Sequence, residues 1–422
     1  MKDTKKIYKK DRVLYIIEAA LEYFISLLIT DAFLATLLTK NGITDSVAGI
    51  ITQLASLSFS AQLCAVFVRK DTGKKRFVTF MHLTNQMLFV LLYLVPGVKV
   101  STDIKVVLFV MLFIGGHFIA NLVSPYKLAW LMSLVPDKER GRFTANKEIV
   151  SLVGGMSFSF IMGSLVDYCE ASGKEDIGFA LCGITIFVLA ILHFLTLIFI
   201  KEPYEKEASE HVSFGKAVMS VVKNKALLKV MLINVGYHLA TGICVSFYGT
   251  YKINELGLSL KYIAFLAMLS STSRVLVSRP FGRFADKYSW AKMMSICFLI
   301  LAGAFFTNVF AIPGNGHVII AIYSCLYAVS LAGINGGLMN IVFEYVPNNE
   351  RSGALGISSA AGGIAGFLMA IVGSRILEAV QNNGNRVKSI PVYGQQLLSA
   401  IAFVIIVLLI VYMKTVIMKL KK

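Results

Sequence analysis

Apolar runs long enough to cross a membrane dominate this chain. About twelve runs of roughly 20 or more mostly apolar residues follow one another along the 422 residues. At 1.5 Å per residue, a helix of about 20 residues spans the hydrocarbon core of a bilayer, which is about 30 Å thick. Only 15% of the residues are charged and 56% are apolar, unlike a soluble domain. The sequence predicts an all-α membrane protein with twelve transmembrane helices and no soluble catalytic domain.

The predicted helices form two groups of six. They span residues 13–39, 43–68, 77–96, 104–134, 144–167, 178–200, 227–252, 259–280, 288–311, 318–346, 352–379 and 395–418. A short motif recurs after the fourth helix of each group, as residues 135–141 (VPDKERG) and 346–352 (VPNNERS). Such repetition is typical of transporters built from duplicated halves. We predict an N-terminal six-helix bundle (1–200), a cytoplasmic linker (201–226) and a pseudo-symmetric C-terminal bundle (227–422).

The positive charge indicates an orientation in the membrane. The net charge is +17. If the N-terminus is cytoplasmic, the cytoplasmic segments hold 31 of the 41 Lys and Arg residues and the outer loops hold nine. This asymmetry places both termini in the cytoplasm, because basic loops stay on that side. It also argues against a nucleic-acid partner, since the basic residues form no single patch. We expect a multi-pass protein of the plasma (inner) membrane whose first helix is retained, because that run is longer than a signal peptide.

Motifs for metal binding or catalysis are missing from the sequence. The six cysteines are scattered, without a CxxC pair or the spacing of metal ligands. No GxxxxGK[ST], HExxH or GxSxG motif occurs. We therefore expect no bound metal, no cofactor and no enzymatic activity.

The segment after the eighth predicted helix carries a resemblance to a known family. Residues 282–287 (GRFADK) resemble the G-x-x-x-D-[RK]-x-G-[RK]-[RK] loop of the major facilitator superfamily, with Ser289 in place of its second glycine. Residues 69–76 (RKDTGKKR), after the second helix, keep the glycine and the basic run but shift Asp71 by one position. The resemblance extends over the whole chain, because the loop occurs at the same place in both halves and the number of spans is twelve.

The resemblance implies a latch that stabilises one of two access states. Gly282 would let two helices approach closely. Asp286 would accept from the start of the eleventh helix and pair with Arg351 or Arg283. Arg274 would pair with Glu344 at a cytoplasmic gate. The alternative is an ordinary set of basic turns that follow the positive-inside rule. The residues expected to act in gating are Asp71, Arg140, Arg274, Gly282, Asp286, Glu344 and Arg351.

Ionisable residues inside the predicted spans are the candidates for function, because each costs roughly 2.5–3.5 kcal/mol to insert. The resemblance implies that helices one, four, seven and ten line a central cavity, while three, six, nine and twelve face outward. Glu18 and Glu22 share one helix face. Glu22 lies about 15 Å and Lys127 roughly 13 Å from the cytoplasmic side, at similar depths. We predict an ion pair between Glu22 and Lys127, beside which a second carboxylate would tend to hold its proton and so create a proton-coupling site. Alternatively, Glu18 is interfacial and Lys127 extends to the surface.

The second half offers a corresponding set of polar residues. Asn234 and His238 share one face of the seventh helix, where they could bind solute or a proton, or form a hydrogen-bonded helix contact. The predicted substrate or proton-binding residues are Glu18, Glu22, Asn121, Lys127, Asn234, His238, Asn335 and Asn340.

The predicted function is secondary active transport of a small solute by alternating access, with H+ as coupling ion and a monomer as the working unit. The acid-rich first half favours export of a cationic or amphipathic compound, and a sugar, a polyol or another polar metabolite is the alternative. Two alternatives from other functional classes are a membrane sensor that no longer transports and an intramembrane enzyme.

The predicted topology can be tested by labelling single cysteines. Cysteines at Thr72, Lys138 and Ser209 should react with an impermeant reagent from the cytoplasmic side only, because all three lie in basic segments. Cysteines at Lys174 and Asn383 should react from the opposite side. Labelling of Thr72 and Lys174 from the same side would contradict the twelve-span arrangement.

Overall fold

The described part of the chain is almost entirely helical. The computed structural model describes residues 8–64, 74–135, 140–202, 219, 223–344, 351–387 and 390–420. Within these residues the strands form one antiparallel hairpin, in which β1 (Arg386–Val387) pairs with β2 (Ile390–Pro391). The predicted all-α class is confirmed. Asp71, the 136–139 part of the repeated motif and most of the predicted linker lie outside the described residues.

The helices of the first half follow the predicted order. They are α2 (Lys9–Leu28), α3 (Asp31–Thr39), α4 (Asp45–Leu57), η1 (Ser58–Ser60), α5 (Ala61–Cys64), α6 (Lys74–Leu92), η3 (Val95–Gly97), α7 (Thr102–Ser133), α8 (Arg140–Ala171) and α9 (Glu175–Phe199).

The second half repeats this order. Its helices are α11 (Lys225–Cys244), η5 (Val245–Phe247), α12 (Tyr248–Thr250), η6 (Tyr251–Glu255), α13 (Leu260–Lys287), α14 (Trp290–Asn308), α15 (Gly316–Phe343), α16 (Arg351–Asn382), α17 (Gly394–Thr415) and η7 (Ile417–Lys419).

Eleven helical stretches among the described residues are long and apolar enough to cross a membrane. They match eleven predicted helices to within a few residues. The other predicted helix, 77–96, corresponds to α6, which has 19 residues and packs against α7 and α9. Polar residues lower its hydropathy, among them His82, Asn85 and Gln86, and all three are buried. These polar side chains face protein rather than lipid, which lets this helix be more polar than the others.

The first predicted helix, 13–39, is broken into α2 and α3. Thr30 is extended, with φ −135° and ψ 168°, and Asp31 follows with φ 47°. This left-handed conformation is uncommon for a residue other than glycine, although the short polar side chain of aspartate tolerates it. The break places Asp31 where its carboxylate accepts from Lys252 of the second half at 2.7 and 2.5 Å. Sequence periodicity gave no sign of this break.

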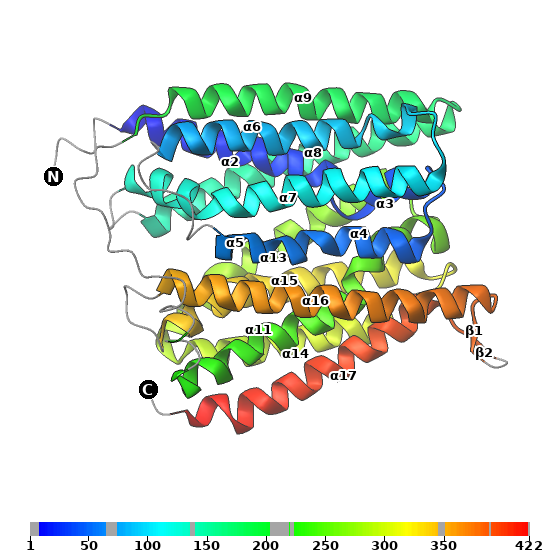
Figure 1. Ribbon diagram of the computed structural model, residues 1–422. Helices are drawn as coiled ribbons and strands as arrows, with labels where there is room; N and C mark the ends of the chain where they lie inside the picture. The colour runs from blue at the N-terminus through cyan, green and yellow to red at the C-terminus, as the bar shows by residue number, and fades with distance from the viewer. Residues whose placement is uncertain are drawn as a thin grey trace.

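The two halves lie side by side as two helical bundles (Figure 1). The first-half helices occupy the upper part of the view and the second-half helices the lower part, with both chain ends at the same end of the molecule. Contacts between the halves run mainly along α4 with α16 and α8 with α13. The predicted arrangement of two six-helix bundles is confirmed.

Polar contacts join the bundles at the end opposite the termini. Besides the pair of Asp31 and Lys252, Asp45 of α4 accepts from Asn254 at 2.6 Å and from Gln381 at 3.0 Å. Asp167 of α8 accepts from the two backbone N–H groups at the start of α13 at 2.9 and 2.7 Å, a favourable place for a negative charge. These contacts hold the two bundles together at this end.

Glycines allow α11 and α16 to approach closely. A Cβ on Gly242 would overlap the carbonyl oxygen of Gly366, and a Cβ on Gly362 would lie 2.8 Å from the side chain of Asn234. The G-x-x-x-G spacing of Gly362 and Gly366 therefore marks a packing surface, as small residues do between membrane helices. The seam between these two helices leaves no room for a larger residue.

Adding one methyl group at this seam should destabilise the protein. We expect Gly242→Ala to lower the melting temperature of the purified protein, because overpacking typically costs about 1–3 kcal/mol. Gly303→Ala in α14 is the matched control, since no heavy atom of the described residues lies within 4 Å of a Cβ at that position, and alanine favours a helix. Equal melting temperatures for the two variants would contradict the packing argument.

Candidate functional site

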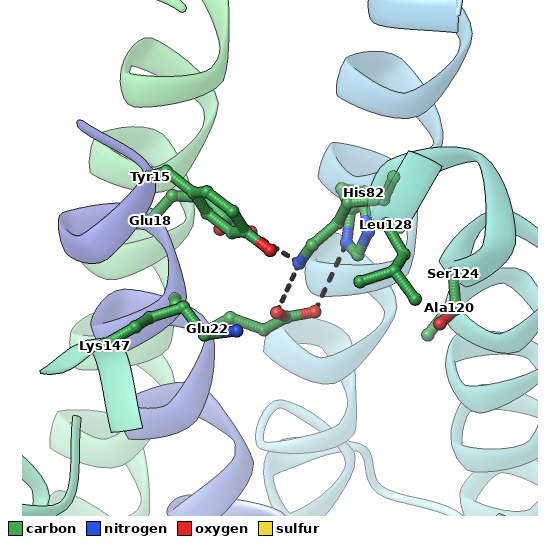
Figure 2. A pocket seen from close by; sticks show the side chains of 10 residues that line it. Tyr15, Glu18, Glu22, His82, Ala120, Ser124, Leu128 and Lys147 are labelled. Carbon is green, nitrogen blue, oxygen red and sulfur yellow. Dashed lines mark hydrogen bonds and ion pairs between the residues drawn. The ribbon is translucent and has the colours of Figure 1, made fainter. Parts of the chain in front are cut away.

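A buried cluster of charged residues lies inside the first bundle. Figure 2 shows Glu18 and Glu22 of α2 beside each other, and Lys127 of α7 contacts the carboxylates of both. The side chain of Glu18 is 0% exposed, that of Lys127 13% and that of Glu22 42%. The predicted pair of Glu22 and Lys127 is therefore present. The alternatives of an interfacial Glu18 and a surface-directed Lys127 are wrong, because each side chain is held by the other inside the bundle.

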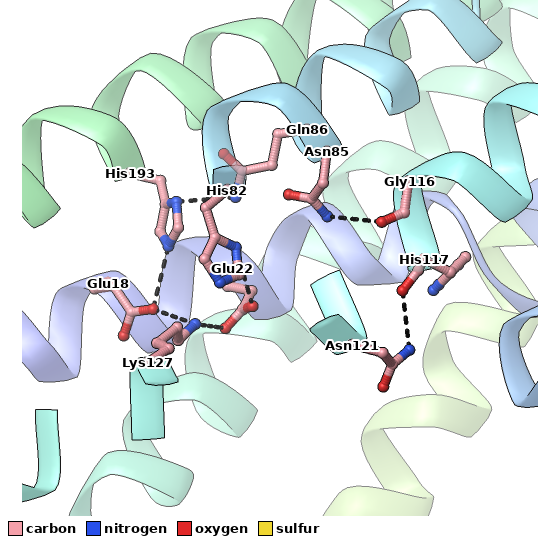
Figure 3. Close-up of polar contacts among 10 residues, drawn as sticks. All are labelled: Glu18, Glu22, His82, Asn85, Gln86, Gly116, His117, Asn121, Lys127 and His193. Atoms are coloured by element: carbon pink, nitrogen blue, oxygen red, sulfur yellow. Dashed lines mark hydrogen bonds and ion pairs between the residues drawn. The ribbon is translucent and has the colours of Figure 1, made fainter. Parts of the chain in front are cut away.

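Two histidines extend this cluster onto the neighbouring helices. His193 of α9 lies 2.9 Å from the side-chain nitrogen of Gln86 and 3.2 Å from Glu18 (Figure 3). An amide nitrogen can only donate, so Nδ1 of His193 accepts and its Nε2–H donates to Glu18. His82 of α6 lies 3.8 Å from Glu22. We call Glu18, Glu22, His82, Lys127 and His193 the α2 ion cluster.

Sequence reasoning missed the part that α6 and α9 play in this cluster. The resemblance implied that both helices face outward, so their histidines were not among the predicted site residues. His82 and His193 are 2% and 0% exposed. The available signal was compositional: polar side chains that cannot face lipid must find partners inside the bundle.

A cavity of about 160 Å³ borders the α2 ion cluster. Its wall includes Glu18, Glu22, His82, Lys127 and Lys147 (Figure 2). Oε2 of Glu18 and both ring nitrogens of His82 are buried without a hydrogen-bond partner among the described residues. Buried polar atoms of this kind favour a polar occupant such as water. No group of three or more His, Cys, Asp or Glu side chains in the described ranges is arranged to hold a metal ion.

A second, larger cavity lies between the two bundles. Its volume is about 360 Å³, and its wall combines residues of both halves. The first half contributes Tyr23, Asp31, Thr52 and Leu152. The second half contributes Val245, Tyr248, Lys252, Ile263, Leu266, Ala267, Ser270, Ser271, Arg274, Tyr323, Ser324, Tyr327, Ala328 and Leu331. We call this space the central cavity, and no residue lines both cavities.

The helices around the central cavity differ from those expected. Helices one, seven and ten contribute, as the resemblance implied, through α2 and α3, the segment from η5 to η6, and α15. The expected contribution of helix four is wrong for the described residues, because α7 turns Lys127 toward α2 inside the first bundle. Instead α4, α8 and α13 complete the wall.

Comparison with known proteins identifies the family. The family model described as Major Facilitator Superfamily matches residues 15–370. The chain belongs to the major facilitator superfamily. It is therefore a membrane transporter of that superfamily, a family of transporters rather than enzymes. No curated protein sequence matched the chain.

Solved structures of the superfamily share the fold at low sequence identity. The nucleoside transporter NupG has a TM-score of 0.70 at 14% identity and covers 97% of this chain and 100% of its own. A D-xylose-proton symporter has a TM-score of 0.65 at 14% identity, covering 94% and 96% of the two chains. An auto inhibited POT family peptide transporter has a TM-score of 0.72 at 10% identity, covering 96% and 97%.

The superfamily loop is partly helical in this transporter. Gly282 and Asp286 lie in the last turns of α13, which continues to Lys287. The close helix approach expected at Gly282 is not found among the described residues, none of which places a heavy atom within 4 Å of a Cβ there. Asp71 lies outside the described residues, as do the side chains of Asp286, Arg140 and Arg351, so their roles stay predictions.

Arg274 makes a different contact from the one expected. Its Nη2 lies 3.3 Å from the carboxylate of Glu148 on α8. The predicted pairing of Arg274 with Glu344 is wrong, because α13 packs along α8 and Glu148 faces the guanidinium there. The resulting ion pair joins the two bundles.

The predicted asparagines and His238 lie outside both cavities. Asn121 donates to Ser58 at 2.9 Å, and Asn234 donates to the backbone of Ser358 at 2.6 Å. Asn340 donates within its own helix, Asn335 is exposed, and the His238 ring packs near Phe59. The geometry of Asn234 fits the alternative of a helix–helix contact.

Removing the lysine of the α2 ion cluster should destabilise the transporter. Lys127→Met leaves two carboxylates without their cation, one of them fully buried, so we expect a loss of about 3 kcal/mol. The triple variant that adds Glu18→Gln and Glu22→Gln should recover much of this loss. Thermal unfolding of the purified protein measures both, with Lys414→Met at an exposed position of α17 as control. A triple variant no more stable than Lys127→Met would refute the pairing.

Proposed function

We propose that the chain is a secondary active transporter that moves a small solute through the central cavity by alternating access. The observation that carries this proposal is the position of the cavity, about 360 Å³ in volume, between two bundles that both supply its wall. Rocking of one bundle against the other would expose such a site to each side of the membrane in turn. Cross-bundle contacts at the end opposite the termini would have to break for the cavity to open on that side.

We propose that the transport is coupled to protons at the α2 ion cluster. Glu22 lines the smaller cavity and the adjacent Tyr23 lines the central cavity. Protonation of Glu22 would weaken its attraction to Lys127 and so change how α2 is held against α7. Because α2 also forms part of the central cavity, the same helix would sense the proton and the solute.

The central cavity favours an amphipathic solute. Its wall mixes tyrosine rings and aliphatic side chains with the hydroxyl groups of Ser270, Ser271 and Thr52. The expectation of a cationic solute rested on the acidic residues of the first half. Glu18 and Glu22 line the smaller cavity and pair with Lys127, so they give a cation no binding site in the central cavity.

The proposed setting is the plasma membrane with both termini in the cytoplasm and a monomer as the working unit. The position of the two chain ends at one end of the molecule supports an even number of crossings (Figure 1). The basic loops support the cytoplasmic location of the two termini.

Counterflow in proteoliposomes tests the transport proposal. Vesicles loaded with an unlabelled candidate solute should accumulate the labelled solute transiently, because an alternating carrier exchanges one for the other. Binding of a solute without counterflow would favour a transport-dead sensor. Chemical conversion of the solute would favour an enzyme.

Glu22→Gln should separate proton coupling from solute binding. If Glu22 carries the coupling proton, the variant loses uphill transport driven by a pH gradient but keeps solute exchange. The control is Glu378→Gln, which removes a carboxylate whose partner is the exposed Arg375, 3.5 Å away. Loss of exchange as well would show that Glu22 binds solute directly. Wild-type behaviour in both assays would remove Glu22 from the mechanism.

A further inference from the structure

We propose that the central cavity binds an organic monoanion, whose carboxylate pairs with Arg274 and whose flat apolar body lies against the tyrosines of the second half. This inference deepens the proposed transport function by naming the class of solute. It rests on the charges that line the cavity, on the geometry of one arginine and on an arrangement of stacked rings.

The charge of the cavity wall is positive. Three charged side chains line it, namely Asp31, Lys252 and Arg274. Two cations and one carboxylate leave a net charge of +1. Both oxygens of Asp31 accept from Lys252, at 2.7 and 2.5 Å, so these two charges largely cancel. Arg274 is the remaining charge available to a solute.

Arg274 is placed to exchange one carboxylate for another. Its ion pair within the described residues uses only Nη2, at 3.3 Å from Glu148. Glu148 does not line the central cavity, and its side chain is 50% exposed. A guanidinium carries five N–H donors in a planar fork that matches a carboxylate with two parallel hydrogen bonds. A solute carboxylate in the cavity would therefore compete well with a single, half-solvated glutamate contact.

Three neighbouring tyrosine rings line the same cavity. The rings of Tyr248 and Tyr323 have centroids 4.5 Å apart, and those of Tyr323 and Tyr327 are 5.5 Å apart with an interplanar angle of 27°. Flat rings pack well on such a surface. The volume of about 360 Å³ lies near the lower end of the range for ligand pockets, roughly 300–1,000 Å³. A solute with one ring and a short carboxylate arm fits these dimensions.

A cationic solute is the competing class, because tyrosine rings attract cations. In this cavity, however, Lys252 and Arg274 line the same space as the rings. A cationic solute would be repelled by these two side chains. The carboxylate in the wall, Asp31, is already paired with Lys252. The wall charge therefore favours the anion.

The test is ligand-induced thermal stabilisation of the purified transporter by a matched set of probes. The probes are 3-phenylpropanoate, 3-phenylpropanamide and 3-phenylpropylamine, which share one ring and differ in charge. We expect the carboxylate to raise the melting temperature and to bind at least about tenfold more tightly than the neutral amide, a difference of about 1.4 kcal/mol. The amine should bind more weakly than the amide. Failure of the carboxylate to stabilise the protein, or equal binding of the amide or the amine, would overturn the proposal.

Variants on the two sides of the ion pair should act in opposite directions. Arg274→Gln should abolish the preference for the carboxylate over the amide, and Glu148→Gln should strengthen carboxylate binding several-fold, because it removes the competing partner. Arg279→Gln, at an exposed position of the same helix, is the matched control and should keep the wild-type preference. If Arg274→Gln does not fold, Arg274→Lys replaces it and should weaken the preference, since lysine lacks the planar fork. An unchanged preference in the Arg274 variant, or weaker carboxylate binding in Glu148→Gln, would overturn the proposal.

This binding measurement is independent of transport. Carboxylate binding without counterflow would support the inference and remove the proposed transport function. Counterflow of a neutral or cationic solute, without carboxylate binding, would support the transport function and overturn the inference of an anionic solute.

Discussion

The cost of placing a charge in the hydrocarbon region governs the first bundle. Lys127 is retained inside it because two carboxylates from α2 surround its ammonium group. Glu18 in turn accepts from His193, which is fixed by Gln86. Each polar group in this series is balanced by the next, so three further helices are held against α2. Removing any one member leaves a buried group without its partner.

The α2 ion cluster lies apart from the central cavity in which we place the solute. Glu18 and Glu22 are held by Lys127 beside the smaller cavity, while Arg274 lines the central cavity. Both α2 and α8 border the two spaces: Glu22 and Lys147 line the smaller cavity, and Tyr23 and Leu152 line the central cavity. A change in the protonation of the cluster would reach the central cavity through movement of α2, without competition between proton and solute for one group.

The two bundles are joined by contacts that differ in character along their length. At the end opposite the termini, Asp31 leaves the helical path with φ 47° and reaches Lys252 across the seam. Nearer the middle, Arg274 and Glu148 form a half-exposed pair. Ion pairs of this kind can break and re-form at low cost because water replaces the lost partner. Such pairs can therefore separate when the two bundles move apart. The fully buried pair of Glu18 and Lys127 would be costly to break, so it keeps the first bundle together as a unit.

The sequence by itself determined the membrane class, the positions of the helices, the two-bundle plan and the pairing of Glu22 with Lys127. These depend on local composition and on helical periodicity, which fix how deep a residue lies and which face it occupies. The sequence could not reveal that His82 and His193 turn inward to the cluster, that helix four leaves the central cavity, or that Arg274 meets Glu148 instead of Glu344. Each of these depends on how one helix is rotated and which neighbour it packs against. Only the tertiary structure decides such contacts, because every face of a membrane helix that is not exposed to lipid has several possible partners.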